Sequence, residues 1–294
     1  MEKNEKEYLQ NLCRRIRYLT IDEIAELGVG HAGGSMSPIE ALVVLYYKHM
    51  RVDPNNPKLA GRDRFILSKA HAGPGLYAVL ADKGYFSLEK LKTLNKPGTS
   101  LPSHVDMVRT PGIDMTAGSL GQGLSCAVGQ ALGAKLRKEN ARIYVMIGDG
   151  ETNEGQIWEA AMYAGHRKLN NLICFTDYNK MQLDGETTEI NDLEPLSDKW
   201  RAFGFEVHSV DGHDVEAIDE AVTAARQSQD KPVMIILHTL KGKGVSFLEE
   251  KWMNNHNVTI SKEQRDLAFK ELEQGKSSLS ACEGTGGAVP CMKQ

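Results

Sequence analysis

The chain has 294 residues, of which 41% are hydrophobic, enough for one large α/β domain or two small ones. Lysines and arginines number 35 and aspartates and glutamates 39, with no long block of one sign, which argues against nucleic acid as a partner. No apolar run approaches the roughly 20 residues that span a membrane, and the charged start and five cysteines without a CxxC pair indicate a cytoplasmic protein.

Apolar periodicity predicts alternating helices and strands. The predicted helices, in chain order, are 8–27, 37–50, 73–83, 120–138, 153–168 and 215–228, the last capped by Asp214. The predicted strands are 64–67, 142–147, 172–176, 205–210 and 233–238. Three of them are almost wholly apolar, as strands buried on both faces are. The pattern predicts an α/β fold of three layers, with a mainly parallel sheet covered by helices on both faces.

A short glycine motif follows the strand that ends at Ile147. Gly148-Asp149-Gly150 leads from this strand into a predicted helix, and the free N–H groups at such a junction suit phosphate oxygens. Asp149 would add the hard oxygen donor that a Mg²⁺ bridging a diphosphate requires. On its own, the tripeptide is more often a tight turn after a buried strand.

The next predicted strand is followed closely by Asn179. Because the carboxyl ends of adjacent parallel strands meet at one edge, Asn179 can share a metal with Asp149. Together the two segments resemble the signature of thiamine-diphosphate enzymes, at the spacing usual in transketolases. The resemblance implies a thiamine-diphosphate-binding domain over residues 1–274, with Mg²⁺ held by Asp149, Asn179 and the Met181 carbonyl. The remaining residues, 275–294, are rich in Ser, Gly and Thr and are expected to form a flexible tail.

Three histidines lie in segments that are similar to active-site segments of transketolases. His31 and His71 stand in glycine-containing loops, and His104 comes shortly before a further glycine-rich stretch. A histidine taken alone is more often structural. The ordered match from Gly30 through Gly185 covers more than half of the chain, and it implies that His31 and His104 contact sugar hydroxyls and relay protons. The same resemblance places His71 nearer the diphosphate.

The resemblance extends to a loop that contacts the cofactor. Gly118, Ser119 and Leu120 are similar to the loop that touches the aminopyrimidine and lies under the thiazolium ring. Transketolases usually have proline where Ser119 stands, so this loop is expected to be less rigid. Gly150 is implied as a further cofactor contact.

Three more residues are implied by their positions. Lys241 matches a lysine that closes over the cofactor, although a solvated loop is an equally good interpretation of its glycine-rich segment. His256 matches a later histidine, but it stands in Asn-Asn-His-Asn rather than Trp-His-Gly. Glu154 matches a glutamate near a partner's catalytic glutamate, and an acid favoured by the helix dipole is the alternative.

Transketolases also need a glutamate from a separate pyrimidine-binding domain. Only residues 245–294 follow Gly244, too few for another sheet domain. The resemblance therefore implies the N-terminal subunit of a split transketolase, active in an α₂β₂ assembly with a C-terminal subunit that carries that domain and its catalytic glutamate. It would transfer a two-carbon ketol unit from a ketose to an aldose, by default pentose phosphates, with a sulfonated or branched sugar left open.

Two alternatives stay open at this point. One is another thiamine-diphosphate enzyme, such as a 2-oxo acid decarboxylase or dehydrogenase subunit or a deoxyxylulose-phosphate synthase fragment. The segments around His31, His71 and His104 argue against it. The other is a catalytically silent scaffold of the same fold, against which the retained Asp149 and Asn179 argue.

Overall fold

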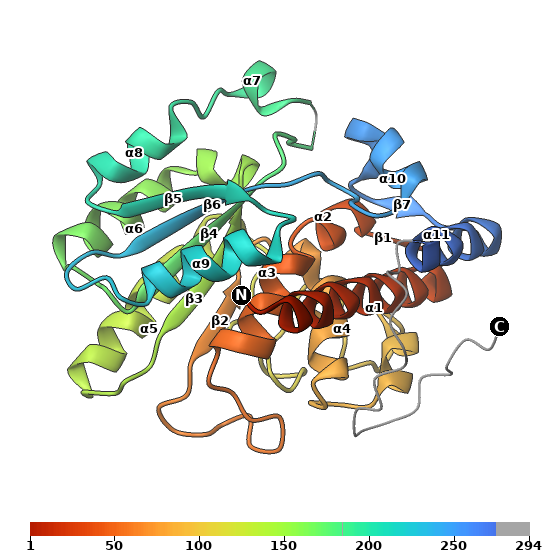
Figure 1. Ribbon diagram of the computed structural model, residues 1–294, viewed down its shortest axis with the longest axis horizontal. Coiled ribbons are helices and arrows are strands. Elements are labelled where there is room, and N and C mark those ends of the chain that lie inside the picture. Colours follow the sequence, from red (N-terminus) through yellow and green to blue (C-terminus); the bar gives the residue numbers. More distant parts are fainter. Residues whose placement is uncertain (184, 275–294) are drawn as a thin grey trace.

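The computed structural model describes residues 1–183 and 185–274 and is built around a five-stranded sheet (Figure 1). Across the sheet the strands are β2 (Arg64–Leu67), β3 (Ile143–Gly148), β4 (Leu172–Tyr178), β6 (Val233–His238) and β5 (Glu206–Asp211). Every neighbouring pair is parallel. The predicted parallel sheet is confirmed, and each predicted strand agrees closely with an observed one.

Helices cover both faces of this sheet (Figure 1). One face packs against α1 (Lys3–Leu27), α3 (Ile39–Val44), α4 (Gly73–Asp82) and α9 (Val215–Ala225), and the other against α5 (Gln122–Leu136), α6 (Gly155–His166) and α8 (Leu196–Ala202). In β3, Tyr144 and Met146 enter the first cluster, whereas Val145 and Ile147 enter the second. Burial on both faces explains the apolar strands, and the three-layer α/β fold is confirmed.

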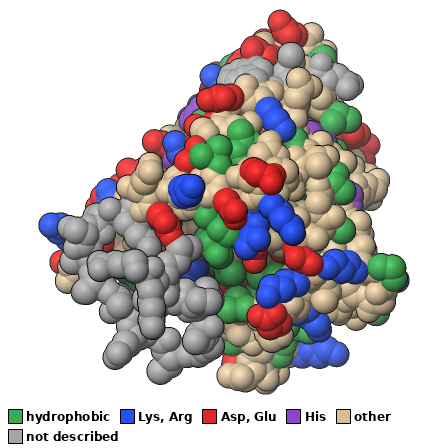
Figure 2. Space-filling model, turned by 90° about the vertical axis from the view of Figure 1, so that its right-hand side faces the viewer, with side chains coloured by type: hydrophobic (Ala, Val, Ile, Leu, Met, Phe, Trp, Pro, Cys, Tyr) green, Lys and Arg blue, Asp and Glu red, His purple; other side chains and the backbone are tan. Residues whose placement is uncertain are grey.

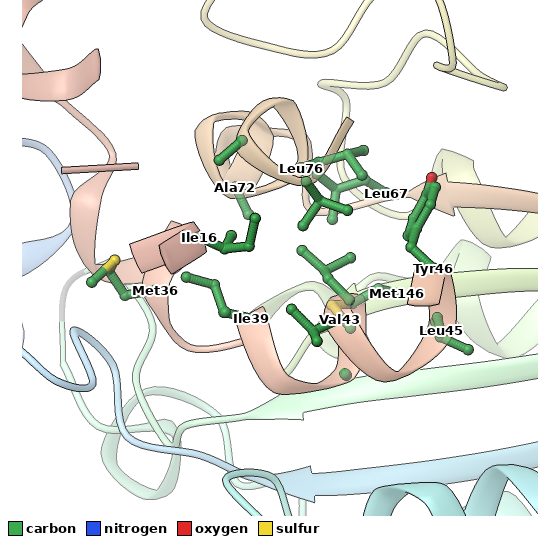
Figure 3. Packing of buried hydrophobic residues seen from close by; sticks show 14 of the residues in the cluster. Ile16, Met36, Ile39, Val43, Leu45, Tyr46, Leu67, Ala72, Leu76 and Met146 are labelled. Carbon is green, nitrogen blue, oxygen red and sulfur yellow. The ribbon is translucent and has the colours of Figure 1, made fainter. Parts of the chain in front are cut away.

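The first cluster fixes the N-terminal helices against the sheet. Ile16 of α1, Val43 of α3 and Leu76 of α4 gather there with Leu67 of β2 and Met146 of β3 (Figure 3). All five side chains are buried, and each such burial contributes roughly 1.5–3 kcal/mol. The loops that leave β2 and β3 therefore start from a rigid base.

The predicted helices are present with shifted ends. Asp214 caps α9 as expected, accepting a hydrogen bond of 3.0 Å from the Glu216 N–H. The predicted helix 37–50 divides into α3 and a π-helical turn, Leu45–His49. The predicted helix 153–168 corresponds to α6, and a short 3₁₀ helix, Gly150–Asn153, lies between it and the strand that carries the Gly-Asp-Gly motif.

Several short or polar elements were not predicted. They are β1 (Val29–Gly30), α2 (Ala32–Met36), the 3₁₀ helices Ala70–Ala72, Leu88–Thr93 and Trp252–Asn255, α7 (Thr187–Ile190), α8, α10 (Ser246–Glu250), β7 (Val258–Thr259) and α11 (Lys262–Gln274). β1 and β7 form an antiparallel ribbon in which Gly30 lies opposite Val258. This ribbon joins two segments that are far apart in the sequence.

The surface carries charges of both signs. Figure 2 shows lysine and arginine side chains interspersed with aspartate and glutamate on the face that lies at the right of Figure 1. Within residues 1–183 and 185–274, no helix combines the length and apolar character needed to cross a membrane. The predicted tail, 275–294, falls outside the described residues.

Candidate active site

Nearly all of the predicted site residues line one pocket at the carboxyl edge of the sheet. Its volume is about 340 Å³, and its walls come from the segments after β2, β3, β4 and β6, where open α/β sheets bind ligands. The predicted residues in its lining are His31, His71, His104, Gly118, Leu120, Asp149, Gly150, Glu154, Asn179, Met181, Lys241 and His256. Ser119 is predicted too, but it is not part of the lining.

Asp149 brings a buried carboxylate to this pocket, with 3% of the residue exposed. It accepts hydrogen bonds from the N–H groups of Gly150 (2.8 Å) and Met181 (3.3 Å). No lysine, arginine or histidine of the described chain forms an ion pair with it. Burial, followed by the nearby carboxylate of Asp177, raises the pKa of Asp149 to about 7. The carboxylate is therefore placed for a cation that the protein does not supply.

Asn179 and Met181 lie beside Asp149. The Asn179 side-chain oxygen accepts a hydrogen bond of 3.1 Å from the same Met181 N–H that faces Asp149. Asn179 and Met181 follow β4, whereas Asp149 follows β3, so the parallel pairing of the two strands brings the oxygen donors together. A carboxylate and an amide oxygen form a donor set that suits Mg²⁺.

Lys241 is a buried positive charge without an ion-pair partner in the described chain. It is 6% exposed, and within the described part of the chain its ammonium has neither an ion pair nor a side-chain hydrogen bond. Burial, followed by the repulsion of Lys69, lowers the pKa of Lys241 to about 8. Lys69 is also buried, but it pairs with Asp177, which in addition accepts hydrogen bonds from the hydroxyls of Ser37 and Thr239.

An unmatched carboxylate and an unmatched ammonium thus face one pocket. A buried charge is costly unless a partner compensates it. A ligand that carries both a cation and an anion would compensate both charges at once, and a metal-bound diphosphate is such a ligand. The residues present therefore fit the thiamine diphosphate and Mg²⁺ that the sequence implies.

Four histidines form the wall next to these charges. The ring centroid of His31 lies 5.7 Å from that of His71, 5.5 Å from that of His104 and 5.0 Å from that of His256. The β1–β7 ribbon explains the last distance, since His31 follows β1 and His256 precedes β7. Gly34 allows the close packing, because a Cβ there would lie 2.9 Å from Nε2 of His71.

Three of these imidazoles are neutral near pH 7. Burial lowers the pKa of His31, with a further contribution from His104. Burial and then Lys241 lower the pKa of His256 to about 4, and burial and then Lys69 hold the pKa of His71 well below its ordinary value. A neutral imidazole can donate one hydrogen bond and accept another, so the wall suits a polyhydroxylated ligand.

Some of the lining residues were not predicted: Gly34, Lys69, Glu151, Gln182 and Leu183, besides Gly148 of the quoted motif. Lys69 stands two positions before His71, and Glu151 directly follows the Gly-Asp-Gly motif. Their nearness to predicted residues was the available signal. A charged residue is usually exposed, and only the fold shows that these two are buried.

Comparison with known proteins shows relatives of two lengths. Residues 9–272 match the family "Transketolase, thiamine diphosphate binding domain". Over 266 residues the chain is 58% identical to the 6-deoxy-6-sulfo-D-fructose transketolase subunit SqwG of Clostridium sp., covering 90% of this chain and 96% of that one. Over 270 residues it is 38% identical to an apulose-4-phosphate transketolase subunit of Phocaeicola vulgatus, covering 91% and 95%.

Solved structures show the same fold within longer chains. The transketolase of Campylobacter jejuni has a TM-score of 0.85 and 33% identity, and the match covers 90% of this chain but 42% of that one. In length, the chain therefore corresponds to the separate subunits and to part of a full-length transketolase. The chain belongs to the transketolase family, of which it carries the thiamine diphosphate-binding domain.

Proposed function

We propose that the chain is the N-terminal subunit of a split transketolase that uses thiamine diphosphate and Mg²⁺. The observation that carries the proposal is the pair of unmatched buried charges, Asp149 and Lys241, which face one pocket beside four histidines. The activity is the transfer of a two-carbon ketol unit from a ketose to an aldose, in keeping with the family. Residues 1–274 act as the cofactor-binding domain.

Asp149, the Asn179 side chain and the Met181 carbonyl hold Mg²⁺. The hydrogen bonds of the following turn run from the Thr187 N–H to the Lys180 carbonyl and from the Gln182 N–H to the Gly185 carbonyl. Among the described residues, none donates a backbone hydrogen bond to the Met181 carbonyl, which suits it to this role. A cation here would neutralise the buried Asp149 carboxylate.

His71, Gly150 and Lys241 contact the diphosphate, with Lys241 matching its negative charge. Gly118, Ser119 and Leu120 contact the ring systems of the cofactor. When bound, thiamine diphosphate supplies the nucleophilic carbon and the electron sink for the two-carbon unit.

The histidines act on the sugar. His31 and His104 hydrogen-bond to its hydroxyl groups, and a neutral His31 can accept a proton from one hydroxyl and return it to another. His256 joins them through its closeness to His31. The three rings line the side of the pocket on which the sugar reacts.

The rest of the site comes from a C-terminal subunit with the pyrimidine-binding domain and a catalytic glutamate. Two observations support this partner. The chain covers 42% of the Campylobacter jejuni transketolase, and Leu120 and Leu183 line the pocket yet remain 39% and 64% exposed. Glu154, an exposed residue of the lining, is then near the partner's glutamate in an α₂β₂ assembly of the cytoplasm.

We propose a sulfonated ketose, 6-deoxy-6-sulfo-D-fructose, as donor in preference to the pentose phosphates expected by default. The support is the 58% identity, over 96% of its length, to a subunit named for that sugar. The test is an assay of the two-chain complex with each donor and an aldose phosphate acceptor. We expect faster transfer from the sulfonated ketose and no CO₂ release, whereas CO₂ release from a 2-oxo acid would favour a decarboxylase.

A further inference from the structure

Glu151 lines the pocket but is absent from the roles assigned above. It is 3% exposed, although it carries a carboxylate. Oε1 accepts a hydrogen bond of 2.9 Å from the Gly121 N–H and another from the Ser68 hydroxyl, and Oε2 accepts one of 3.0 Å from the Gly148 N–H. Three donors therefore converge on one buried carboxylate.

The three donors belong to three separate segments of the site. Ser68 follows β2 and precedes Lys69 and His71, and Gly148 ends β3 just before Asp149. Gly121 ends the loop of residues 118–121 and precedes α5. Each segment carries residues that line the pocket. Glu151 thus joins the segment of Ser68 and His71, the turn at Asp149 and the loop of residues 118–121.

The packing around this junction leaves little room for adjustment. A Cβ at Gly123 would collide with the Ser68 side chain, so the first turn of α5 lies directly against the segment after β2. The hydrogen bonds of Glu151 also satisfy the backbone N–H groups of Gly121 and Gly148. Bonds to a carboxylate are stronger than bonds to a neutral acceptor.

We infer that Glu151 is a positioning residue that holds the 118–121 loop against the segments after β2 and β3, so that thiamine diphosphate finds its binding surface already formed. The inference rests on the proposed function. A preformed loop avoids the ordering cost that binding would otherwise include. Loss of the junction should therefore weaken cofactor binding more than it weakens the fold.

Glu151→Gln is the main test, because glutamine keeps the shape of the side chain. Its amide group can accept through one oxygen only, so an NH₂ donor then faces another donor. In the complex with the C-terminal subunit, we expect the Kd of thiamine diphosphate at saturating Mg²⁺, measured by calorimetry, to rise roughly tenfold or more. The KM of the sugar donor at saturating cofactor should stay near the wild-type value.

Two further variants serve as a second test and as a control. Ser68→Ala removes one donor and leaves both backbone bonds, so it should raise the Kd less than Glu151→Gln and still fold if that variant does not. Glu159→Gln, at an exposed position of α6, is the matched control and should leave the Kd unchanged.

The outcomes separate the inference from the proposed function. A wild-type complex that binds no thiamine diphosphate would overturn the proposed function itself. Wild-type binding with an unchanged Kd in Glu151→Gln and Ser68→Ala would overturn only the role of Glu151. A graded rise in Kd across these two variants, with complex formation retained, supports it.

Discussion

At the scale of single residues, we expect a substitution of Asp149 to stabilise the cofactor-free chain and to weaken its binding of ligands. Its carboxylate is buried without an ion-pair partner in the described chain. We expect Asp149→Asn to stabilise the cofactor-free chain at pH 8, by on the order of 1–4 kcal/mol, because removing a buried uncompensated charge outweighs the loss of one of the two hydrogen bonds that Asp149 accepts. The same variant should lose the stabilisation that Mg²⁺ and thiamine diphosphate give to the wild type.

Thermal unfolding with and without the two ligands measures both effects. Asp230→Asn, at an exposed position, is the control and should change neither. An Asp149→Asn chain that is less stable than the wild type and still responds to the ligands would show that Asp149 has a structural role.

Site residues that stand within recognisable motifs could be predicted from the sequence. Asp149 and Asn179 could be predicted to converge, because adjacent parallel strands end at the same edge of the sheet. The three loop histidines could be placed in the same site only through the resemblance to transketolases. Glu151 and Lys69 could not. Their burial depends on segments distant in the sequence, and a charged residue gives no local sign that it is buried.

At the scale of elements, a buried carboxylate joins three helical segments. Glu40 of α3 accepts a hydrogen bond of 2.7 Å from Arg17 of α1 and lies 3.3 Å from Nδ1 of His213, just before α9. Burial alone would raise the pKa of Glu40, but Arg17 and His213 outweigh burial and lower this pKa to about 2. The interactions of the Glu40 carboxylate therefore contribute stability that is complete above about pH 4.5 and is lost as the pH falls toward about 2.

Glu40→Gln should accordingly lower the free energy of unfolding near pH 7 by on the order of 3 kcal/mol. The difference from the wild type should shrink as the pH falls below about 4.5. Urea unfolding between pH 7 and pH 3 measures this trend, with the exposed Glu220→Gln as control. A difference that stays constant over this range would contradict the assignment.

Asn255 joins two segments of the chain near Lys241 through hydrogen bonds. Its fully buried side-chain amide donates hydrogen bonds of 3.0 Å to the carbonyls of Lys241 and Leu248. Asn255→Asp places a carboxylate oxygen against these carbonyls, so we expect a loss of about 1–3 kcal/mol in unfolding free energy. Asn254→Asp, one position away and exposed, should cost little. Equal unfolding midpoints for the two variants would count against this role.

Elements with a strong apolar pattern, either periodic or continuous, were predictable, whereas short or polar elements were not. β3, β4 and β6 are nearly continuous apolar runs, which explains the success with the sheet. β1 and β7 have two residues each, too few for any period, yet their pairing brings His31 and His256 together. α11 buries only Ala268, Phe269 and Leu272, and most of its other residues are charged or polar, so its apolar stripe is weak.

At the scale of the whole molecule, the chain corresponds to part of a full-length transketolase. The fold matches 42% of a full-length transketolase, and the two relatives of similar length described above are named as subunits. In the proposed function, the charges and histidines of this chain hold the cofactor and the sugar, and a second chain supplies the glutamate.

The most direct measurement mixes the purified chain with its purified C-terminal partner. Ketol transfer is assayed with Mg²⁺, thiamine diphosphate, a ketose donor and an aldose acceptor, for each chain alone and for the equimolar mixture. We expect transfer in the mixture and none from either chain alone. Transfer by this chain alone, or a mixture that binds the cofactor and transfers nothing, would contradict the proposed division of the active site between two chains.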